Sequence, residues 1–341
     1  MSFFNRIMES LNKGHNISSE DSELAMREII EGRFAEVQTA AFLTALKIKG
    51  ETSEEIAGLA KEMMNHCIKV KCEDPDAVDI VGTGGDGSNS INISTTAALI
   101  AAGAGVTIAK HGNRAASSKS GSADVLAALG VKLDIKPAQL EECLKRNGIA
   151  FLYAPLMHPA MKNVMPVRKS LGFRTVFNIL GPLCNPAGVT RYVMGVYSDK
   201  LCSVIAGACA DLGFRRALVV HGSDGLDEFT VTGPTYVSEL KDGQVIEYKV
   251  SPEELDMPLC NPEDIKGGTP EENAAAVKNI LCGKSPGGAH QNIAVLNAAA
   301  AIYAADRVDC WEYAIEKAVE SIESGSALKK LKQLVEFTSS C

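Results

Sequence analysis

The chain has 341 residues, of which 46% are hydrophobic and 22% are charged, so it has enough apolar material for a substantial core and about two domains. Its 34 basic and 42 acidic residues give a formal net charge of −8, which disfavours general binding to nucleic acids or membranes, because both polyanions favour a basic surface. Only 5% of the residues are aromatic, which also disfavours a stacking platform for single-stranded nucleic acid.

The cysteines and the N-terminus indicate where the protein works. Ten cysteines are scattered from Cys67 to Cys341 without any C-x-x-C pair, a distribution typical of free thiols in a reducing compartment. The N-terminus lacks the apolar core of a signal peptide, and the most apolar run, 95–106, is too short to span a bilayer. The sequence therefore predicts a cytoplasmic protein.

The first seventy residues are expected to be helical. Ser18 precedes an apolar-periodic segment in the manner of a helix cap, and a second helix is expected over 37–48. Thr52 and Glu55 have the spacing of a capping box at the start of a third helix. Because these helices have no strand partners, residues 1–72 are predicted to form a small helical domain.

After Pro75 the pattern changes to strands that alternate with helices. Helices are expected over 95–102, over 122–129 and through the tail 271–341. The expected strands are 77–81, 105–109, 149–152, 193–197, 216–221 and 245–250. This alternation is typical of an α/β domain with a largely parallel sheet.

A basic helical segment near 160–180 interrupts that alternation and is expected to return to the N-terminal helices. The predicted organisation is a helical domain of residues 1–72, joined by about 164–188, and an α/β domain made of 73–163 and 189–341.

A glycine-rich segment, 82–87, follows the first predicted strand. It contains G-x-G-x-x-G, but six residues separate it from the next helix, and the following strand leads to Lys110-His111 where a nicotinamide site needs an acid. A basic residue at that place suits phosphate. A glycine turn without a ligand remains open, although four glycines in six residues cost backbone entropy, which is easier to explain if a ligand approaches the backbone.

Two more segments suit phosphate groups. Residues 92–96 place an amide and hydroxyls at a helix N-terminus, and 110–118 place cations, serines and a glycine at a strand end. A simple helix cap and a solvated basic loop are the alternatives. All three segments are expected at the carboxyl ends of neighbouring strands, where open α/β sheets bind ligands. Together they predict a polyphosphate pocket.

The remaining polar segments suggest a metal and an acceptor. Asp227 and Glu228 follow the predicted strand 216–221 and could hold magnesium, although a surface acidic turn is the alternative. Arg168 could hold a carboxylate through two parallel hydrogen bonds. His158 precedes a proline at a helix start, where capping or packing is as plausible as contact with a ligand.

These motifs occur together in one family. The chain resembles the anthranilate phosphoribosyltransferases over nearly its whole length, at 82–86, 92–95, 110–118, 158–161, Arg168 and 227–228. The resemblance implies a small N-terminal helical bundle domain plus a larger α/β domain with a mainly parallel central sheet, and a homodimer joined through the helical domain. It implies that the phosphoribosyl group of 5-phosphoribosyl 1-diphosphate moves to the amine of anthranilate, with Mg²⁺, in tryptophan biosynthesis.

The resemblance also implies roles for single residues. The donor is expected to bind Gly82, Gly85, Asp86, Ser90, Asn92, Ile93, Ser94, Thr95, Lys110, His111, Gly112, Asn113, Arg114, Ala115, Ala116, Ser117, Ser118 and Ser122. Anthranilate is expected to bind Gly82, Asn113, His158 and Arg168. Magnesium is expected at Ser94, Asp227 and Glu228, and the catalytic residues are expected to be Lys110, Asp227 and Glu228. Ser90 departs from the expected threonine but keeps the hydroxyl.

Two other functions remain open at this point. A pyrimidine nucleoside phosphorylase shares the implied fold, and Asn113-Arg114 favours the transferase over it. A non-enzymatic paralogue that binds nucleic acid is disfavoured by the net charge of −8 and by the intact acidic pair at 227–228.

Overall fold

The N-terminal part of the chain folds into short helices that begin at well-defined caps. The computed structural model describes residues 1–115 and 118–341. The first helices are α1 (Phe3–Asn12), α2 (Ser19–Ile30), α3 (Glu36–Lys49) and α4 (Ser53–Asn65). The Ser18 hydroxyl accepts a hydrogen bond from the Asp21 amide at 3.1 Å, and Thr52 and Glu55 form the predicted capping box. The three predicted helix starts are therefore confirmed.

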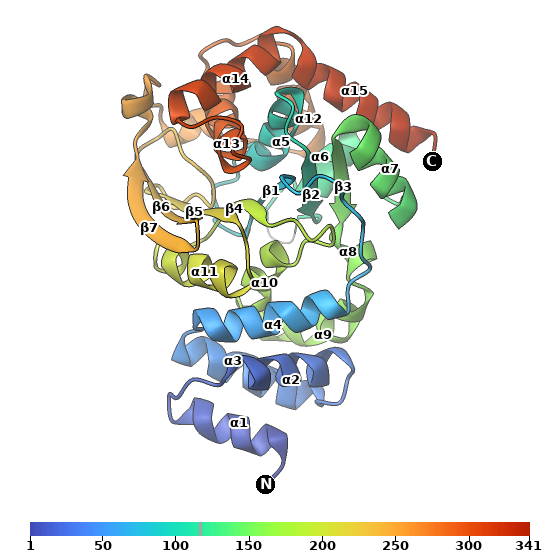
Figure 1. Ribbon diagram of the computed structural model, residues 1–341, viewed down its shortest axis with the longest axis vertical. Helices are drawn as coiled ribbons and strands as arrows, with labels where there is room; N and C mark the ends of the chain where they lie inside the picture. The colour runs from blue at the N-terminus through green and yellow to red at the C-terminus, as the bar shows by residue number, and fades with distance from the viewer. Residues whose placement is uncertain (116–117) are drawn as a thin grey trace.

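A later segment returns to these helices. It contains α8 (Ala154–Met157), a 3₁₀ turn (Pro159–Asn163), α9 (Met165–Leu171) and α10 (Phe177–Leu183). Helix α9 packs on α3 and α10 packs on α4. The Asn163 side chain donates a hydrogen bond to the Ile30 carbonyl at 2.7 Å. The helices α1 to α4 and α9 form a layer at one end of the molecule (Figure 1).

A seven-stranded sheet forms the centre of the larger part. Its strands are β1 (Val78–Gly82), β2 (Ile108–Gly112), β3 (Ile149–Tyr153), β4 (Arg191–Gly195), β5 (Arg216–Gly222), β6 (Thr235–Lys241) and β7 (Gln244–Val250). The strand order is β3-β2-β1-β4-β5-β6-β7. The pairs among the first five strands are parallel, and β6 and β7 are antiparallel additions. The predicted α/β class with a mainly parallel sheet is confirmed.

Two predicted strands are shifted by two or more residues, and one strand is not predicted. Strand β4 runs from Arg191 to Gly195 instead of 193–197. Strand β2 runs from Ile108 to Gly112 instead of 105–109, because Gly105 has a φ of +92° and forms the turn after the preceding helix. Lys110 and His111 therefore lie within the strand. Strand β6 is not predicted because it is polar, yet Glu239 is buried there, where it accepts a hydrogen bond from Arg216 at 2.8 Å.

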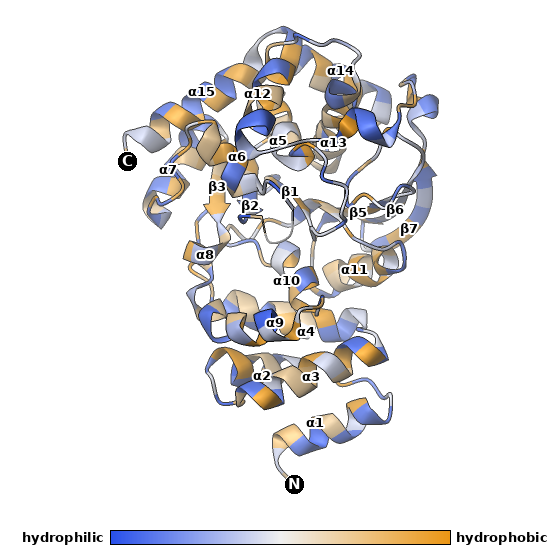
Figure 2. Cartoon of the chain, turned by 180° about the vertical axis from the view of Figure 1, so that it is seen from behind, coloured by the Kyte–Doolittle hydropathy of each residue, from blue (hydrophilic) through white to orange (hydrophobic). Residues whose placement is uncertain are grey.

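Helices cover both faces of the sheet. They are α5 (Ile93–Gly103), α6 (Ser122–Ala128), α7 (Pro137–Asn147), α11 (Lys200–Asp211), α12 (Pro270–Leu281), α13 (Ala289–Ala304), α14 (Trp311–Glu323) and α15 (Ser326–Ser339). The almost wholly buried α5 packs against α13, α15 and β1, which explains its apolar sequence. Helices α10 and α11 lie between the sheet and α4 (Figure 2). Among the described residues, no helix is long and apolar enough to cross a membrane.

Candidate active site

Four neighbouring parallel strands end in a glycine at the same edge of the sheet. These residues are Gly112 of β2, Gly82 of β1, Gly195 of β4 and Gly222 of β5. Because β1 and β2 are neighbours, the glycine-rich segment and the segment that follows Lys110 emerge side by side. The structure thus brings together the segments for which the sequence predicts phosphate binding.

The acidic pair, Asp227 and Glu228, lies against two of the three predicted donor segments. Asp227 Oδ2 accepts a hydrogen bond from the Gly84 amide at 2.5 Å, and Glu228 Oε1 accepts one from the Ser94 amide at 3.2 Å. The side chain of Lys110 also reaches Ser94, where Nζ lies 3.3 Å from the hydroxyl oxygen. The pair is therefore tied to the glycine-rich segment and to the start of α5.

Asp227 can lie this close to β1 and β4 only because each strand has a glycine there. A Cβ atom at Gly195 would overlap the Asp227 backbone, and a Cβ atom at Gly82 would overlap the Asp227 carboxylate. Sequence reasoning included Gly82 in the site but missed Gly195. The signal was a glycine within the predicted strand 193–197, where glycine weakens a strand unless another group comes close.

Asp227 and Glu228 are 7% and 8% exposed, so the surface-turn alternative is wrong. Burial is the main reason that the pKa of both carboxyls is raised, and repulsion from Glu228 and Asp86 raises the pKa of Asp227 further. Lys110 acts in the opposite sense on the pKa of Glu228. A buried pair with so few cations around it gains from a bound metal ion.

The donor set suits magnesium shared with a substrate. Within the two described stretches of chain, no three His, Cys, Asp or Glu side chains are grouped so that they could hold a metal by themselves. Magnesium commonly takes one or two carboxylates and completes its coordination with water and substrate phosphates. Asp227 and Glu228, with the Ser94 hydroxyl nearby, fit that requirement.

Lys110 supplies a buried cation at the same place. It is 3% exposed, and its Nζ donates a hydrogen bond to the Ile80 carbonyl at 2.6 Å. Burial lowers its pKa, whereas the carboxylates of Asp79 and Glu228 raise it. The side chain therefore reaches from β2 past β1 to the start of α5, where its charge lies close to Ser94.

The start of α5 does not act as a simple helix cap. The Asn92 side chain makes no hydrogen bond to its own helix and instead donates to the Ser120 carbonyl at 3.1 Å. Its Oδ1 accepts from Asn273 at 2.8 Å. Ile93 and Thr95, at the same helix start, are 2% and 1% exposed. The capping alternative is wrong for Asn92, whose side chain joins the loop at Ser120 to Asn273 of α12.

The segment after β2 is organised by an acid that sequence reasoning missed. Asp124 of α6 accepts hydrogen bonds from the Ala115 amide and the Arg114 guanidinium, both at 2.8 Å. Ser122 donates to the Asn113 carbonyl at 3.1 Å. Arg114, Ser122 and Asn113 therefore form one folded loop beside Gly112. The predicted donor residues Ala116 and Ser117 lie outside the described residues, and Ser118 is exposed.

The glycine-rich segment is an open loop with unusual backbone angles. Gly84, Gly85, Gly87 and Asn89 have φ values of +71°, +73°, +79° and +51°. Asp86 accepts a hydrogen bond from the Ser88 amide at 3.0 Å, which closes a turn within the loop. The predicted donor residue Ser90 pairs with Lys266 in an isolated antiparallel bridge.

Two histidines connect the donor strand to the acceptor segment. His111 and His158 are 3% and 5% exposed, with ring centroids 5.1 Å apart. Burial lowers their pKa values to about 3 and about 4, so both rings are neutral at neutral pH. His158 Nε2 lies 3.0 Å from the Cys184 carbonyl and donates to it. His111 Nε2 has no partner among the described residues.

Arg168 on α9 has the properties expected of a carboxylate ligand. Its guanidinium lies 5.6 Å from the centroid of the Phe177 ring, and burial lowers its pKa. No carboxylate in the described part of the chain lies within ion-pair distance of it. A partly buried arginine without a counter-ion is expected to bind an anion from outside the chain.

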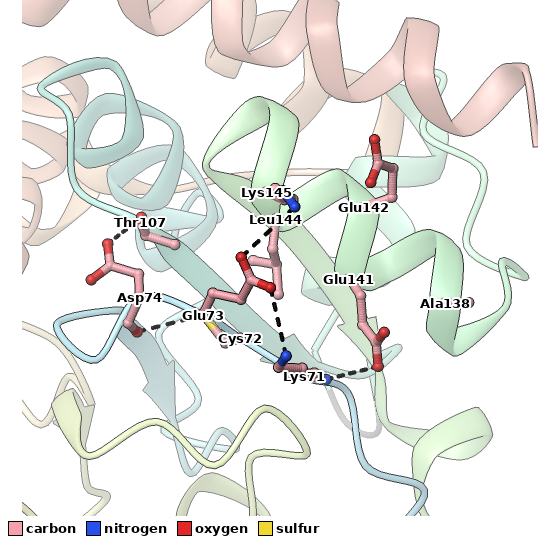
Figure 3. Close-up of a pocket in the computed structure, with 10 residues that line it drawn as sticks. All are labelled: Lys71, Cys72, Glu73, Asp74, Thr107, Ala138, Glu141, Glu142, Leu144 and Lys145. Atoms are coloured by element: carbon pink, nitrogen blue, oxygen red, sulfur yellow. Dashed lines mark hydrogen bonds and ion pairs between the residues drawn. The ribbon is translucent and has the colours of Figure 1, made fainter.

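A cavity of about 520 Å³ at the opposite edge of the sheet does not belong to this site (Figure 3). Its wall includes Thr107, which precedes β2, and Leu144, which precedes β3. Its polar groups pair with one another: Thr107 donates to Asp74 at 2.6 Å, and Lys71 lies 3.6 Å from Glu73. These mutual pairs leave no argument for a ligand there.

Comparison with known proteins agrees with this geometry. Residues 74–328 match the model of the glycosyl transferase family a/b domain, and residues 5–67 match that of its helical bundle domain. An anthranilate phosphoribosyltransferase from Rhodopseudomonas palustris is 48% identical over 98% of this chain and 98% of its own length. One from Methanosarcina barkeri is 51% identical over 98% of this chain and 90% of its own length.

Solved structures agree as well. Anthranilate phosphoribosyltransferase from Thermus thermophilus superimposes with a TM-score of 0.92 at 42% identity, over 97% of this chain and 99% of its own. The enzyme from Saccharomyces cerevisiae, in complex with PRPP and Mg, superimposes with a TM-score of 0.89 at 31% identity, over 99% of this chain and 98% of its own. With two domain models matched and such relatives over nearly its full length, the chain belongs to the anthranilate phosphoribosyltransferase family.

Proposed function

We propose that this chain transfers the phosphoribosyl group of 5-phosphoribosyl 1-diphosphate to the amine of anthranilate, with Mg²⁺ as cofactor. One observation carries the proposal: the buried pair Asp227 and Glu228 is hydrogen-bonded to the backbone of both donor segments, at Gly84 and Ser94. A diphosphate donor with magnesium supplies the cation that the pair needs and the anion that Lys110 and the helix start attract.

The donor is proposed to lie across the ends of β1 and β2. Its phosphates face Lys110, the start of α5 and the loop that Asp124 organises. Anthranilate is proposed to lie between that loop and α9, with its carboxylate on Arg168 and its ring near His158. Magnesium is proposed to bind Asp227, Glu228 and Ser94. These assignments follow the family resemblance residue by residue, and the hydrogen bonds around Asp227, Glu228 and Lys110 support the donor and metal part of them.

Catalysis then rests on placement and charge. The bond between C1 and the diphosphate oxygen breaks with its electron pair moving to diphosphate, and the anthranilate nitrogen forms the new bond to C1. The nitrogen then gives up one proton to water or to the released diphosphate. When bound, magnesium neutralises charge that builds up on the leaving diphosphate. Lys110 adds a fixed positive charge in a buried place, where it acts more strongly than in water. The weakly basic aromatic amine needs no dedicated general base before attack, and holding both substrates in place supplies further rate.

The domain division, assembly and location are part of the proposal. Residues 1–72 with about 164–188 are proposed as the helical domain, and 73–163 with 189–341 as the donor-binding domain. A homodimer is proposed through the helical domain. In support, Val37 and Ile48 of α3 are 77% and 81% exposed, which is unusual for large apolar side chains on a free surface. A cytoplasmic location is proposed from the ten cysteines without C-x-x-C pairs.

The reaction is tested by the fluorescence of anthranilate. Purified protein is expected to consume it only when the diphosphate donor and a divalent cation are both present, and the loss is expected to stop when the cation is chelated. Omission of each component in turn provides the controls. Phosphorolysis of thymidine or uridine, without turnover of anthranilate, would instead assign the chain to the pyrimidine nucleoside phosphorylases.

Arg168→Ala is expected to raise the KM for anthranilate about ten- to a hundredfold, because a hydrogen-bonded charged pair contributes about 1.5–3 kcal/mol. The KM for the donor should change far less. Arg168→Lys should restore only part of the affinity, since lysine keeps the charge but loses the two parallel hydrogen bonds. Steady-state kinetics with each substrate varied in turn checks this. If Arg168→Ala raises the KM for both substrates equally and lowers the melting temperature, Arg168 has a structural role.

A further inference from the structure

A second arginine of the acceptor segment contacts the donor loop. Arg174 lies in the connection between α9 and α10, and its guanidinium donates a hydrogen bond to the Gly85 carbonyl. The same guanidinium lies 4.2 Å from the centroid of the Tyr197 ring, close enough for a cation–π contact. Tyr197 follows β4, so Arg174 joins three parts of the chain that are distant in sequence.

Arg174 contacts the middle of a glycine-rich loop whose other hydrogen bonds to the rest of the chain lie nearer its ends. Three glycines and Asn89 have positive φ values there, so the unbound backbone has more conformational freedom than most loops. Gly85 is exposed, and the guanidinium lies so close that a Cβ atom at Gly85 would meet Arg174 at 3.2 Å. Other hydrogen bonds to the rest of the chain lie toward the two ends of the loop: the Thr83 amide donates to Gly195, the Gly84 amide to Asp227, Lys266 to Ser88 and the Gly267 amide to Asn89.

We propose that Arg174 is a positioning residue for the diphosphate loop and that Tyr197 holds its guanidinium in place; this proposal rests on the proposed function. Arg174 fixes the Gly85 carbonyl while Asp227 fixes the neighbouring Gly84 amide. The two bonds come from different segments of the chain, one from the acceptor segment and one from the metal-binding segment. Together they hold the backbone amides of the loop in place for diphosphate. The loop therefore loses less conformational entropy when the donor binds.

The same contact ties the donor loop to the acceptor segment. Arg174 follows Arg168 by six residues, and both belong to the segment that returns to the helical layer. When this segment is docked, the proposed acceptor ligand Arg168 and the donor loop are placed relative to each other. The donor loop is therefore preorganised only when the acceptor side of the site is also in place.

The proposal predicts a specific effect on the donor. Arg174→Ala is expected to raise the KM for the donor, and the Kd for magnesium diphosphate, about tenfold, because one charge-assisted hydrogen bond and one cation–π contact are lost. The KM for anthranilate should stay near that of the wild type. This is the reverse of the pattern expected for Arg168→Ala, so the two arginines control for each other.

Two further variants separate positioning from direct contact with the donor. Tyr197→Leu removes the aromatic platform without changing charge and should reproduce part of the Arg174→Ala effect, whereas Tyr197→Phe keeps the ring and should behave like the wild type. Lys169→Ala removes an exposed cation from the same segment and should change neither constant. Melting temperatures of all variants show whether each one folds.

The measurements are steady-state kinetics with both substrates and calorimetric binding of magnesium diphosphate to the full chain. Weaker donor binding in both Arg174→Ala and Tyr197→Leu, with unchanged donor binding in Tyr197→Phe, supports the proposal. An unchanged donor KM in Arg174→Ala overturns the proposal. A loss of donor affinity in Arg174→Ala without any loss in Tyr197→Leu also overturns it, because the guanidinium would then contact the donor directly. If wild-type protein does not consume anthranilate, the proposed function fails, and the calorimetric comparison still tests Arg174.

Discussion

The double substitution Asp227→Asn with Glu228→Gln is expected to lower kcat/KM by several powers of ten. The amide oxygens can still accept the hydrogen bonds from Gly84 and Ser94, so the loops keep their places. The negative charges that attract magnesium are lost, and with them the neutralisation of the leaving diphosphate. Raised magnesium should restore part of the activity. Kinetics over a range of magnesium concentrations measure both effects.

The fold should tolerate this change. Both carboxyls are buried, and their raised pKa values mean that their charged forms are unfavourable in the folded chain without metal. Replacing them by amides of similar size should leave the melting temperature equal or higher. Glu253→Gln, an exposed acid in a distant turn, is the matched control and should change neither property. Full activity of the double variant at low magnesium would contradict the metal role.

Gly195→Ala is expected to abolish most of the activity although residue 195 touches no substrate in the proposed site. The added Cβ atom would overlap the backbone of Asp227, and a backbone contact cannot be relieved by a change of rotamer. The acidic segment must move away from β4, which shifts both carboxylates relative to the donor loops. Overpacking of this kind also costs about 1–3 kcal/mol of folding free energy.

Activity and thermal unfolding of Gly195→Ala test this together. Met194→Leu is the matched control, because it alters the preceding buried position of β4 while conserving volume, and it should retain activity. A Gly195→Ala protein with wild-type kcat/KM would show that the acidic segment need not lie where the structure places it. Loss of activity in both variants would point to β4 itself instead of to the contact with Asp227.

Local patterns in the sequence predict the features that local physics determines. The capping box of Thr52 and Glu55 marks a helix start, and the run of short apolar strands predicts the parallel sheet. Strand β6 escapes such reasoning because its polar side chains find partners elsewhere in the fold. Its Glu239 accepts hydrogen bonds from Arg216 of β5 and from Tyr248 of β7. The residue pattern within β6 does not predict these two hydrogen bonds.

Contacts between distant segments explain what the sequence does not reveal about the site. Asp79 of β1 is fully buried and accepts hydrogen bonds from the Asn185 side chain at 2.8 Å and from the His111 amide at 3.1 Å. Burial raises its pKa to about 6. These partners are 106 and 32 residues away in the chain, so the network that aligns the donor strand is visible only in the fold.

The glycine-rich segment and the acidic pair are recognisable from residue types and spacing, because phosphate and magnesium each favour a short list of chemical groups. Their convergence is a property of strand order. Sequence reasoning assigned Asp227 and Glu228 to magnesium and left a surface turn as the alternative, and the fold buries both side chains against the donor loops. Gly195 and Arg174 were missed because their roles depend on distant segments: Gly195 leaves space for the Asp227 backbone, and Arg174 bonds to the Gly85 carbonyl.

The central claim is that one phosphoribosyl group moves from the diphosphate donor to anthranilate at this site. The most direct test measures diphosphate released and anthranilate consumed in the same reaction, with the product identified by mass spectrometry. The account predicts one diphosphate for each anthranilate, a product carrying a phosphoribosyl group on nitrogen, and no diphosphate release when anthranilate is omitted. Diphosphate release that does not depend on anthranilate, or donor that stays intact beside it, would contradict the account.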